Sequence, residues 1–409
     1  MAHLNYVRNV TYRGRASINE LLPDENRDAG FAAFCGTLEQ RRATMLQGIR
    51  RCMGYRGIVL LQNDPQLAEE VTLAAAGSGV RVYHANSGGV CRYDPLYGLS
   101  DAAVLDAVLP VEGKGLGAGS VLEVRSWLQA YLDIMKIRFR IAPGVFGRYP
   151  FNLNLLMQLT EMPYSSLKQR VLAYLPQPEQ ARIARVLAQD HAPQQVCAAV
   201  QAFASGLKNV LWMQADFSAH SRVSIAESVR QRNVIEIAVP SASPAVQQYL
   251  YRELKFLQEQ RVEFLLAASE ISLENSPELR SLFTTPHDAA GIYSTGLSAG
   301  VLSNIASGQE GLAPLLAEHP EVLVFRCSSV QQAEPFSQAL GTYQRRIMDE
   351  HFGRSRRPFH LFAAHDTGVG IHEAAERNVR PQELLELQDG AILCGAFYEA
   401  PVYIRQVLL

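Results

Sequence analysis

The sequence predicts an α/β protein in which a mostly parallel sheet is flanked by helices and an all-α domain is inserted. Three observations support this fold class. The apolar run at 264–268 follows a charged helix end and leaves through polar residues, as a buried central strand of a parallel sheet does. Apolar runs at 57–64 and 80–84 enclose a helical pattern, which together make a βαβ unit. Between 120 and 219 the periodicity is helical, with prolines between successive helices.

The elements follow in the order that such a fold requires. Residues 1–27 are polar and irregular, and we expect an N-terminal arm or an edge strand there. We expect strands at 30–36, 57–64, 80–84, 233–239, 264–268, from 291, at 322–326, and, as a closing hairpin, at 391–397 and 402–408. We expect helices at 37–52, 66–76, after the N-cap Ser100, and at 121–137, 152–160, 164–175, 177–190, 194–213, 244–260, 301–307, 311–318 and 331–341. This order places an α/β domain at 28–119 and 220–409 and the all-α domain at 120–219.

Composition and charge limit the classes of function. The 409 residues are 48% hydrophobic and 19% charged, which is enough apolar material for one large domain and a smaller one. A formal charge of −2 predicts no bulk attraction to nucleic acid or to an anionic membrane, so any such contact must be local. The sequence has no stretch approaching the ~18 uninterrupted apolar residues of a spanning helix. We therefore expect a cytoplasmic protein that reaches a membrane only through a partner.

The cysteine pattern argues against a metal centre. The six cysteines are scattered, without a C-x-x-C motif and without a histidine at ligand spacing. We expect reduced thiols in the core of a cytoplasmic protein, and no metal site. The cysteines are Cys35, Cys52, Cys91, Cys197, Cys327 and Cys394.

The first expected strand and the helix after it stand where a phosphate-binding loop, G-x-x-x-x-G-K-[ST], belongs. Aligned on Gly36, the second glycine is Arg41, the lysine is Arg42 and the hydroxyl residue is Ala43, which Thr44 follows. A side chain at the second glycine blocks the backbone from wrapping phosphates, and arginine is no substitute for a compact ammonium. Alanine also lacks the hydroxyl that would ligate Mg²⁺. On this segment alone, an ordinary turn that never bound phosphate remains the alternative.

The end of the central strand departs from a second motif of nucleotide-binding proteins. In nucleotide-hydrolysing α/β proteins this strand ends in Asp-Glu, where the aspartate holds Mg²⁺ and the glutamate polarises water. Here the two positions are Ser269 and Glu270. A neutral hydroxyl replaces a carboxylate poorly around a hard dication. The agreement between two altered positions favours a degenerate nucleotide site, in which Glu270 would be catalytic only if the site were active.

The densest positive patch lies in a stretch, 345–358, that we expect to be a loop. A solvated surface is the favoured interpretation, and contact with phosphate or DNA is the alternative. The cluster consists of Arg345, Arg346, Arg354, Arg356 and Arg357.

Several weaker motifs occur in an order that resembles a known family. They are the turn 63–65, the loop 93–96, the helical insert, 264–270, the segment from Gly291, 322–326, Ala333-Glu334, Leu340-Gly341, 380–387 and the closing 400–405. Over roughly residues 30–409 this order is similar to the coupling proteins of type IV secretion and conjugation, the TraD/TraG group. The resemblance implies a RecA-like P-loop ATPase fold. It also implies a hexamer that drives DNA, or delivers protein, into a secretion channel.

The chain departs from the family at its catalytic positions, so its Walker motifs look degenerate. The phosphate-loop lysine falls on Arg42 and the Mg²⁺ aspartate on Ser269, while Glu270 is retained. The family's arginine falls near 287–289, its glutamine sensor falls near 298–299, and the usual transmembrane hairpin has no counterpart. The resemblance therefore implies a pseudo-ATPase without a bound cofactor, which is kept for assembly or substrate docking. Its expected partners are an intact coupling ATPase or other subunits of the secretion machine.

The alternative is an active, hexameric DNA-translocating ATPase with an atypical nucleotide site. It would use Arg42 and Glu270 with ATP and Mg²⁺. Phosphate release that DNA stimulates would distinguish this alternative from the pseudo-ATPase.

Overall fold

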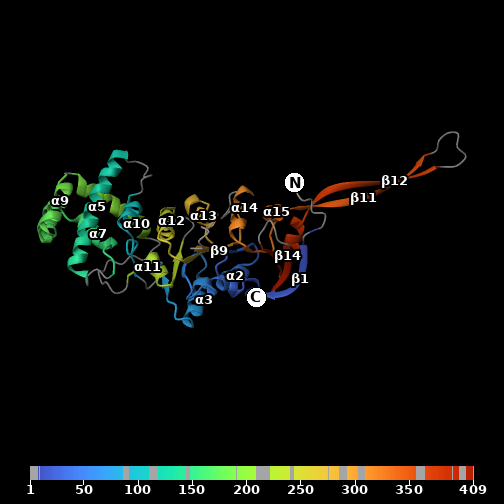
Figure 1. The fold of residues 1–409 in the computed structure, drawn as a ribbon, viewed down its shortest axis with the longest axis horizontal. Helices are drawn as coiled ribbons and strands as arrows, with labels where there is room; N and C mark the ends of the chain where they lie inside the picture. The colour runs from blue at the N-terminus through green and yellow to red at the C-terminus, as the bar shows by residue number, and fades with distance from the viewer. Residues whose placement is uncertain are drawn as a thin grey trace.

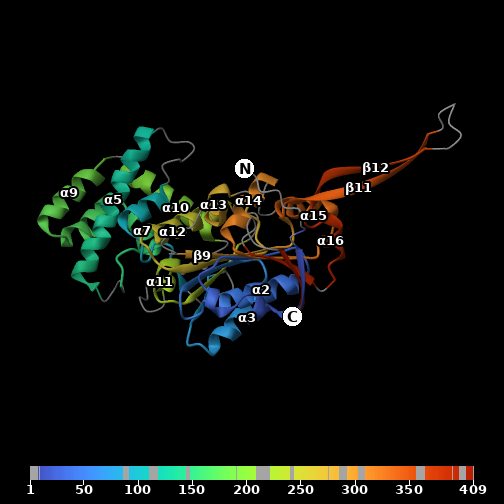
Figure 2. The same cartoon turned by 45° about the vertical axis from the view of Figure 1, so that its right-hand side comes forward.

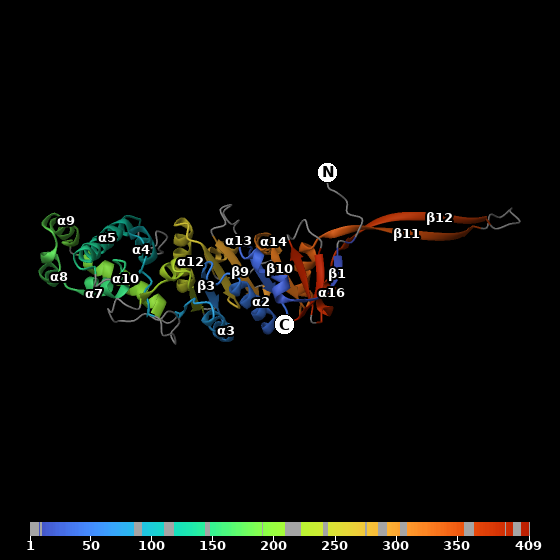
Figure 3. The ribbon, with the colours of Figure 1, turned by 60° about the horizontal axis from the view of Figure 1, so that its bottom comes forward.

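The structure is a computed structural model in which three regions follow one another along the longest axis (Figure 1). A helical body lies at one end, a sheet covered by helices lies in the middle, and a two-stranded ribbon projects from the other end (Figure 3). The structure describes residues 8, 10–85, 92–109, 118–143, 148–189, 191–208, 222–239, 244–274, 276–284, 293–302, 309–355, 364–388, 390–395 and 402–408.

A ten-stranded sheet forms the centre of the molecule. Its strands are β1 (Val10–Ser17), β2 (Phe31–Phe34), β3 (Gly57–Gln62), β4 (Val82–His84), β7 (Val234–Ala238), β8 (Phe264–Ser269), β9 (Tyr293–Ala299), β10 (Glu321–Phe325), β13 (Gly390–Gly395) and β14 (Val402–Leu408). Their order is β1-β14-β13-β10-β2-β9-β8-β3-β7-β4. All neighbours from β10 to β4 are parallel, whereas β13 runs antiparallel to both β10 and β14. The predicted mostly parallel sheet and its closing hairpin are confirmed.

Helices cover both faces of the sheet, which explains why the central strands β3 and β8 are apolar at nearly every position. One face is covered by α2 and α3, and the other by α12 to α15 (Figure 2). In β3, Ile58 and Leu60 pack with the first group, and Val59 and Leu61 pack with the second. The helices around the sheet are α1 (Ile18–Leu21), α2 (Leu38–Arg50), α3 (Pro65–Ala76), α11 (Ile225–Arg230), α12 (Pro244–Glu259), α13 (Pro277–Thr284), α14 (Gln309–Glu318), α15 (Val330–Ala339) and α16 (Pro381–Glu386), with the 3₁₀ turn η1 (Asp24–Asn26).

The helical body has a hydrophobic cluster of its own, with Leu128, Tyr131 and Leu156 among its fully buried members. Val104 of α4 and Phe256 of α12 join the same cluster, so these two helices connect the body to the sheet. The expected N-cap is confirmed, because the Ser100 hydroxyl accepts the N–H of Ala103. The helices of the helical body are α4 (Asp101–Val108), α5 (Ala118–Ile141), α7 (Leu153–Glu161), α8 (Tyr164–Arg170), η2 (Leu172–Tyr174), α9 (Gln177–Leu187) and α10 (Ala192–Lys208). The short strand pair β5 (Arg92–Tyr93) and β6 (Arg222–Val223) lies beside them.

The projecting ribbon corrects one prediction. Residues 345–358 were expected to form a loop, but β11 (Thr342–Ser355) and β12 (Ala364–Arg377) pair as a long antiparallel hairpin. A buried face would impose alternation between apolar and polar residues, and a two-stranded ribbon outside the core lacks that constraint. The strand signal was therefore absent from the sequence.

Two further expectations concern the chain ends and the loops. Of the two alternatives for the N-terminal segment, residues 10–17 form the edge strand β1, which pairs with β14. The helix expected at 301–307 falls largely outside the described residues. Within the described part of the chain, no helix has both the length and the apolar character needed to cross a membrane.

Candidate functional site

The junction between β2 and α2 is shorter than a phosphate-binding loop. Strand β2 ends at Phe34 and α2 begins at Leu38, so Arg41, Arg42, Ala43 and Thr44 all lie inside the helix. Cys35 and Gly36 have positive φ angles of 61° and 64°, which turn the chain directly into the helix. A Cβ on Gly36 would lie 2.5 Å from the Cβ of Phe325, so this position also requires glycine for space.

The first turn of α2 is capped by its own side chains. The Thr37 hydroxyl accepts the N–H of Gln40 at 3.2 Å, and the Gln40 side chain accepts the N–H of Thr37 at 2.9 Å. This capping box satisfies two donors that a helix N-terminus otherwise offers to an anion. The pattern T-x-x-Q at 37–40 was a readable sequence signal that the helix starts at 38 rather than after a long loop.

Arg41 and Glu270 form a bidentate ion pair at the carboxyl edge of the sheet. Arg41 Nε lies 2.7 Å from Glu270 Oε1, and Nη2 lies 2.9 Å from Oε2. The remaining nitrogen, Nη1, donates to the carbonyl oxygens of Cys35 at 2.7 Å and Gly36 at 2.9 Å. Arg41 is 6% exposed, and it packs against Gly300, where a Cβ would lie 2.7 Å from Nη2. The guanidinium therefore fills the space between the β2–α2 turn and the ends of β8 and β9.

Glu270 is held by its backbone as well as by its carboxylate. Its φ angle is 55°, and its N–H donates to the Ser298 carbonyl at 3.1 Å. The Ser298 hydroxyl donates to Glu270 Oε1 at 3.2 Å and lies 3.0 Å from the hydroxyl of the buried Ser269. With two bonds from Arg41 and one from Ser298, the carboxylate uses three of its about four acceptor positions.

Arg42 points to a different strand end. Its Nε lies 2.7 Å from Asp64 Oδ2, and its Nη2 lies 3.2 Å from Oδ1. Asp64 is 4% exposed and caps α3 by accepting the N–H of Gln66 at 3.2 Å. The hydrogen bond to Asp64 raises the pKa of Arg42 further above its usual value. The partly buried Ala43 packs on the sheet, and the buried Thr44 donates its hydroxyl to the Gln40 carbonyl at 2.8 Å.

Comparison with known proteins identifies the fold but not a family. No family model matches the sequence, and no curated protein matches it. The trigonal form of the bacterial conjugative coupling protein TrwB (TrwBdeltaN70) in complex with sulphate matches with a TM-score of 0.50 at 12% identity. The match covers 94% of this chain and 86% of that one. The chain has a RecA-like P-loop fold.

Two other solved structures match the chain at lower scores. TrwB in complex with ADP and Mg²⁺ matches with a TM-score of 0.49 at 13% identity, over 94% of this chain and 86% of that one. VirB4 of Thermoanaerobacter pseudethanolicus matches with a TM-score of 0.44 at 12% identity, over 76% of this chain and 80% of that one.

The P-loop fold brings together some of the sequence-predicted site residues and separates others. Gly36, Arg41, Ser269 and Glu270 meet at one edge of the sheet, as the carboxyl ends of parallel strands do. Arg42 pairs instead with Asp64, which the sequence singled out only as part of a turn. The ion pair between Arg41 and Glu270 was missed, because no local pattern reports a contact across 229 positions.

The described part of the predicted basic cluster lies in β11 of the ribbon, which projects away from this edge (Figure 3). Arg345 pairs with Glu376 at 3.0 Å at the ribbon base, and Arg346 and Arg354 follow along β11. Arg356 and Arg357 lie outside the described residues, as does the stretch 287–289, where the family's arginine was expected.

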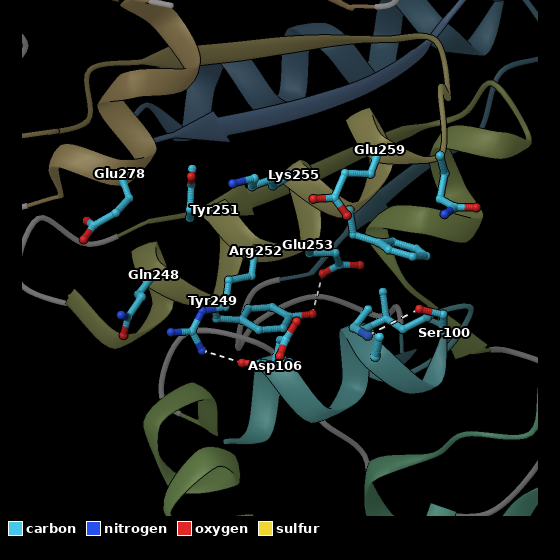
Figure 4. A pocket seen from close by; sticks show the side chains of 16 residues that line it. Ser100, Asp106, Gln248, Tyr249, Tyr251, Arg252, Glu253, Lys255, Glu259 and Glu278 are labelled. Carbon is cyan, nitrogen blue, oxygen red and sulfur yellow. Dashed lines mark hydrogen bonds between the residues drawn. The ribbon is translucent and has the colours of Figure 1, made fainter. Parts of the chain in front are cut away.

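A pocket of about 680 Å³ lies between α4 and α12, apart from the Arg41 edge (Figure 4). Charges of both signs line it, and Arg252 Nη1 donates to the Asp106 carbonyl at 2.7 Å. At its inner wall the fully buried carboxylate of Glu253 accepts hydrogen bonds from the hydroxyls of Tyr93 and Tyr249. Burial raises the pKa of Glu253 to about 7. This pocket marks the junction of the helical body with the sheet.

Proposed function

We propose that the protein is a catalytically degenerate, coupling-protein-like subunit of a type IV secretion, conjugative DNA-transfer or related mobile-element machine. Its role in this proposal is assembly or substrate docking. The observation that carries the proposal is the bidentate pair of Arg41 and Glu270 at the strand-to-helix turn where P-loop proteins bind phosphates. The link to conjugation is supported by the fold, because the chain shares it with TrwB, a conjugative coupling protein.

In this proposal the residues at the edge do not suit a nucleotide with Mg²⁺. Phosphates at the start of α2 would have to displace Arg41 from Glu270 and from the carbonyl of Gly36. Ser269 offers a neutral hydroxyl, already bonded to Ser298, where Mg²⁺ prefers a carboxylate. Separating a buried ion pair costs about 3–5 kcal/mol, which weakens nucleotide binding by roughly 100-fold to 5,000-fold.

A nucleotide titration of the purified full chain tests the proposal. A ligand at about 100 times its Kd stabilises a protein by about 2.7 kcal/mol, which a thermal shift assay detects. We expect no shift with ATP and Mg²⁺ at physiological nucleotide concentration. A clear upward shift would contradict the proposal.

Phosphate release, measured with and without DNA, tests the alternative of an active translocating ATPase with an atypical site. The retention of Glu270 at the end of β8 favours this alternative. Turnover that DNA stimulates, that Glu270→Gln abolishes and that Glu274→Gln leaves intact would replace our proposal with it. Glu274 is a matched control because it is an exposed glutamate four positions further along the chain.

The proposal also assigns partners and regions. The α/β domain of residues 28–119 and 220–409 would mediate self-association or association with an intact coupling ATPase, and residues 120–219 would form the separate all-α domain. Light scattering and co-purification test this assignment. A strict monomer at high concentration, together with the absence of a co-purifying homologue, would count against it.

A further inference from the structure

Two cysteines that are far apart in the sequence meet beside the Arg41 edge. Cys35 follows β2, Cys327 follows the neighbouring strand β10, and their Sγ atoms lie 3.5 Å apart across 292 positions. Both residues are buried, at 2% and 1% exposure. Among the described cysteines, Cys52 instead donates to the Arg27 carbonyl, and Cys197 lies in α10 within the helical body.

The backbones of the two cysteines are anchored by separate hydrogen bonds. The Cys35 N–H donates to the Ala299 carbonyl at 3.1 Å, and its carbonyl accepts Arg41 Nη1 at 2.7 Å. The Cys327 N–H donates to the Leu384 carbonyl at 3.0 Å. The thiols therefore face each other in a fixed frame, and a bond of about 2.05 Å requires them to approach by roughly 1.5 Å. Rotation of the side chains supplies movements of that size.

We propose that Cys35 and Cys327 form a reversible disulfide when the protein meets a hydroperoxide. The Cys35 thiolate attacks one oxygen of hydrogen peroxide, the O–O bond breaks, and a sulfenic acid forms on Cys35. The leaving hydroxide takes up the proton that the thiol released on ionising and becomes water. Cys327 then attacks the Cys35 sulfur, which forms the S–S bond and releases a second water. Two thiols and one peroxide thus give one disulfide and two waters, and a small dithiol reductant reverses the change.

The surroundings make Cys35 the attacking partner. The hydrogen bond from Cys327, together with the charge of Arg41, lowers the pKa of the Cys35 thiol, although burial opposes this shift. The same hydrogen bond and burial raise the pKa of Cys327. Burial raises the pKa of Cys52 to about 11, so that thiol is the less reactive one. A thiolate beside a thiol that can resolve its sulfenic acid is the arrangement of a peroxide-sensitive pair.

The bond would covalently join the ends of β2 and β10 at the turn that holds Arg41. It would constrain the unfolded chain through a loop of 292 positions, so the oxidised protein is expected to melt at a higher temperature than the reduced one. This inference does not depend on whether the site binds nucleotide.

Mass spectrometry of the full chain tests the inference. The reduced protein is titrated with hydrogen peroxide, its free thiols are alkylated, and its intact mass and peptides are measured. We expect a loss of about two hydrogens, a linked peptide pair that contains Cys35 and Cys327, and full reversal by dithiothreitol. Sulfinic acid without a linked pair, or a linkage through other cysteines, would overturn the inference.

Single variants distinguish the attacking role of Cys35 from the resolving role of Cys327. In Cys327→Ser, Cys35 should stop at the sulfenic acid, which dimedone traps, whereas Cys35→Ser should abolish the linked pair. Cys52→Ser and Cys197→Ser are matched controls that should retain the linkage. If a variant fails to fold, the peptide map of the unaltered chain still decides the question. Before oxidation, a bulky maleimide should label Cys35 and Cys327 only after denaturation, because both are buried.

Discussion

Two of the ion pairs between an arginine and a glutamate lie in very different surroundings. Arg41 and Glu270 meet at the sheet edge with side chains that are 7% and 18% exposed. Arg345 and Glu376 meet at the ribbon base, where the corresponding values are 54% and 23%. Water screens the second pair more strongly, and long exposed side chains lose conformational entropy when they pair. The same two residue types should therefore contribute very differently to stability.

The largest expected effect comes from removing the buried carboxylate. Glu270→Met leaves the guanidinium of Arg41 buried without its counter-ion. We expect the free energy of unfolding to fall by about 3–5 kcal/mol. Urea denaturation followed by circular dichroism measures this change.

A double variant is the matched control for that experiment. Arg41→Met combined with Glu270→Met removes both charges and keeps the side-chain volume near the original. Because replacement of a whole buried pair by apolar residues is often close to neutral, most of the lost stability should return. A double variant no more stable than the single one would show that the buried pair is not the cause.

Among the residues that the structure describes, Glu253 is a buried carboxylate without an arginine partner, and it extends the comparison because the stability it contributes should depend on pH. Burial raises the pKa of Glu253 from 4.5 to about 7, so the native state binds this proton more tightly than the unfolded state. The resulting stability is fully present below pH 4.5 and is lost as the pH rises to about 7. The full loss is on the order of 3 kcal/mol.

The measurement compares the native chain with Glu253→Gln, which has no proton to lose. The stability of the native chain relative to the variant should decrease between pH 4.5 and pH 7. The comparison cancels the titration of the other carboxylates, which follow the opposite trend where a cation lowers their pKa. A difference that stays constant over this range would show that the native state does not raise the pKa of Glu253.

The fold could be predicted from the sequence where burial dictates the residue pattern. Strands β3 and β8 are apolar at nearly every position because helices cover both of their faces, and the predicted bounds differ from the structure by two residues or fewer. The ribbon could not be predicted, because strands outside the core face no buried surface that would impose a period of two.

The candidate site could be predicted only in part. Gly36 and Glu270 were located from the positions that motifs occupy at strand ends, and the structure brings their surroundings together. The neighbouring arginines pair with different carboxylates, Arg41 with Glu270 and Arg42 with Asp64. Which carboxylate each arginine meets depends on the register of the helix and on contacts across the sheet. Such contacts leave no mark in a local sequence pattern.

Removing the exposed pair of Arg345 and Glu376 should change the stability of the protein only slightly. Arg345→Ala removes the ion pair with Glu376, and we expect the free energy of unfolding to fall by about 0.2–1 kcal/mol, with a smaller change in high salt. Glu376→Ala should give a loss in the same range. Urea denaturation at two ionic strengths measures both. A loss as large as that expected for Glu270→Met would remove the contrast between the two regions.

The smallest expected effect concerns nucleic acid at the ribbon. A chain with a net charge of −2 has no global field to attract a polyanion, so affinity must come from the local cluster at Arg345, Arg346, Arg354, Arg356 and Arg357. Five neutralised phosphates give a log–log salt slope of about −4 to −5 on duplex DNA. The pairing of Arg345 with Glu376 already neutralises part of this charge, so we expect a shallower slope and weak, sequence-independent binding.

Charge reversal at the far end of the cluster tests this prediction by fluorescence anisotropy with labelled DNA. Arg354→Glu, Arg356→Glu and Arg357→Glu together should abolish the weak binding while leaving the melting temperature unchanged. The matched control reverses Arg50, Arg170 and Arg185, which are exposed on three different helices. The control carries the same change in net charge, so an equal loss in both variants would indicate a general effect of charge. Binding that survives the first reversal but not the second would place the nucleic-acid contact on the helices, because only local cations can hold DNA to a chain with so little net charge.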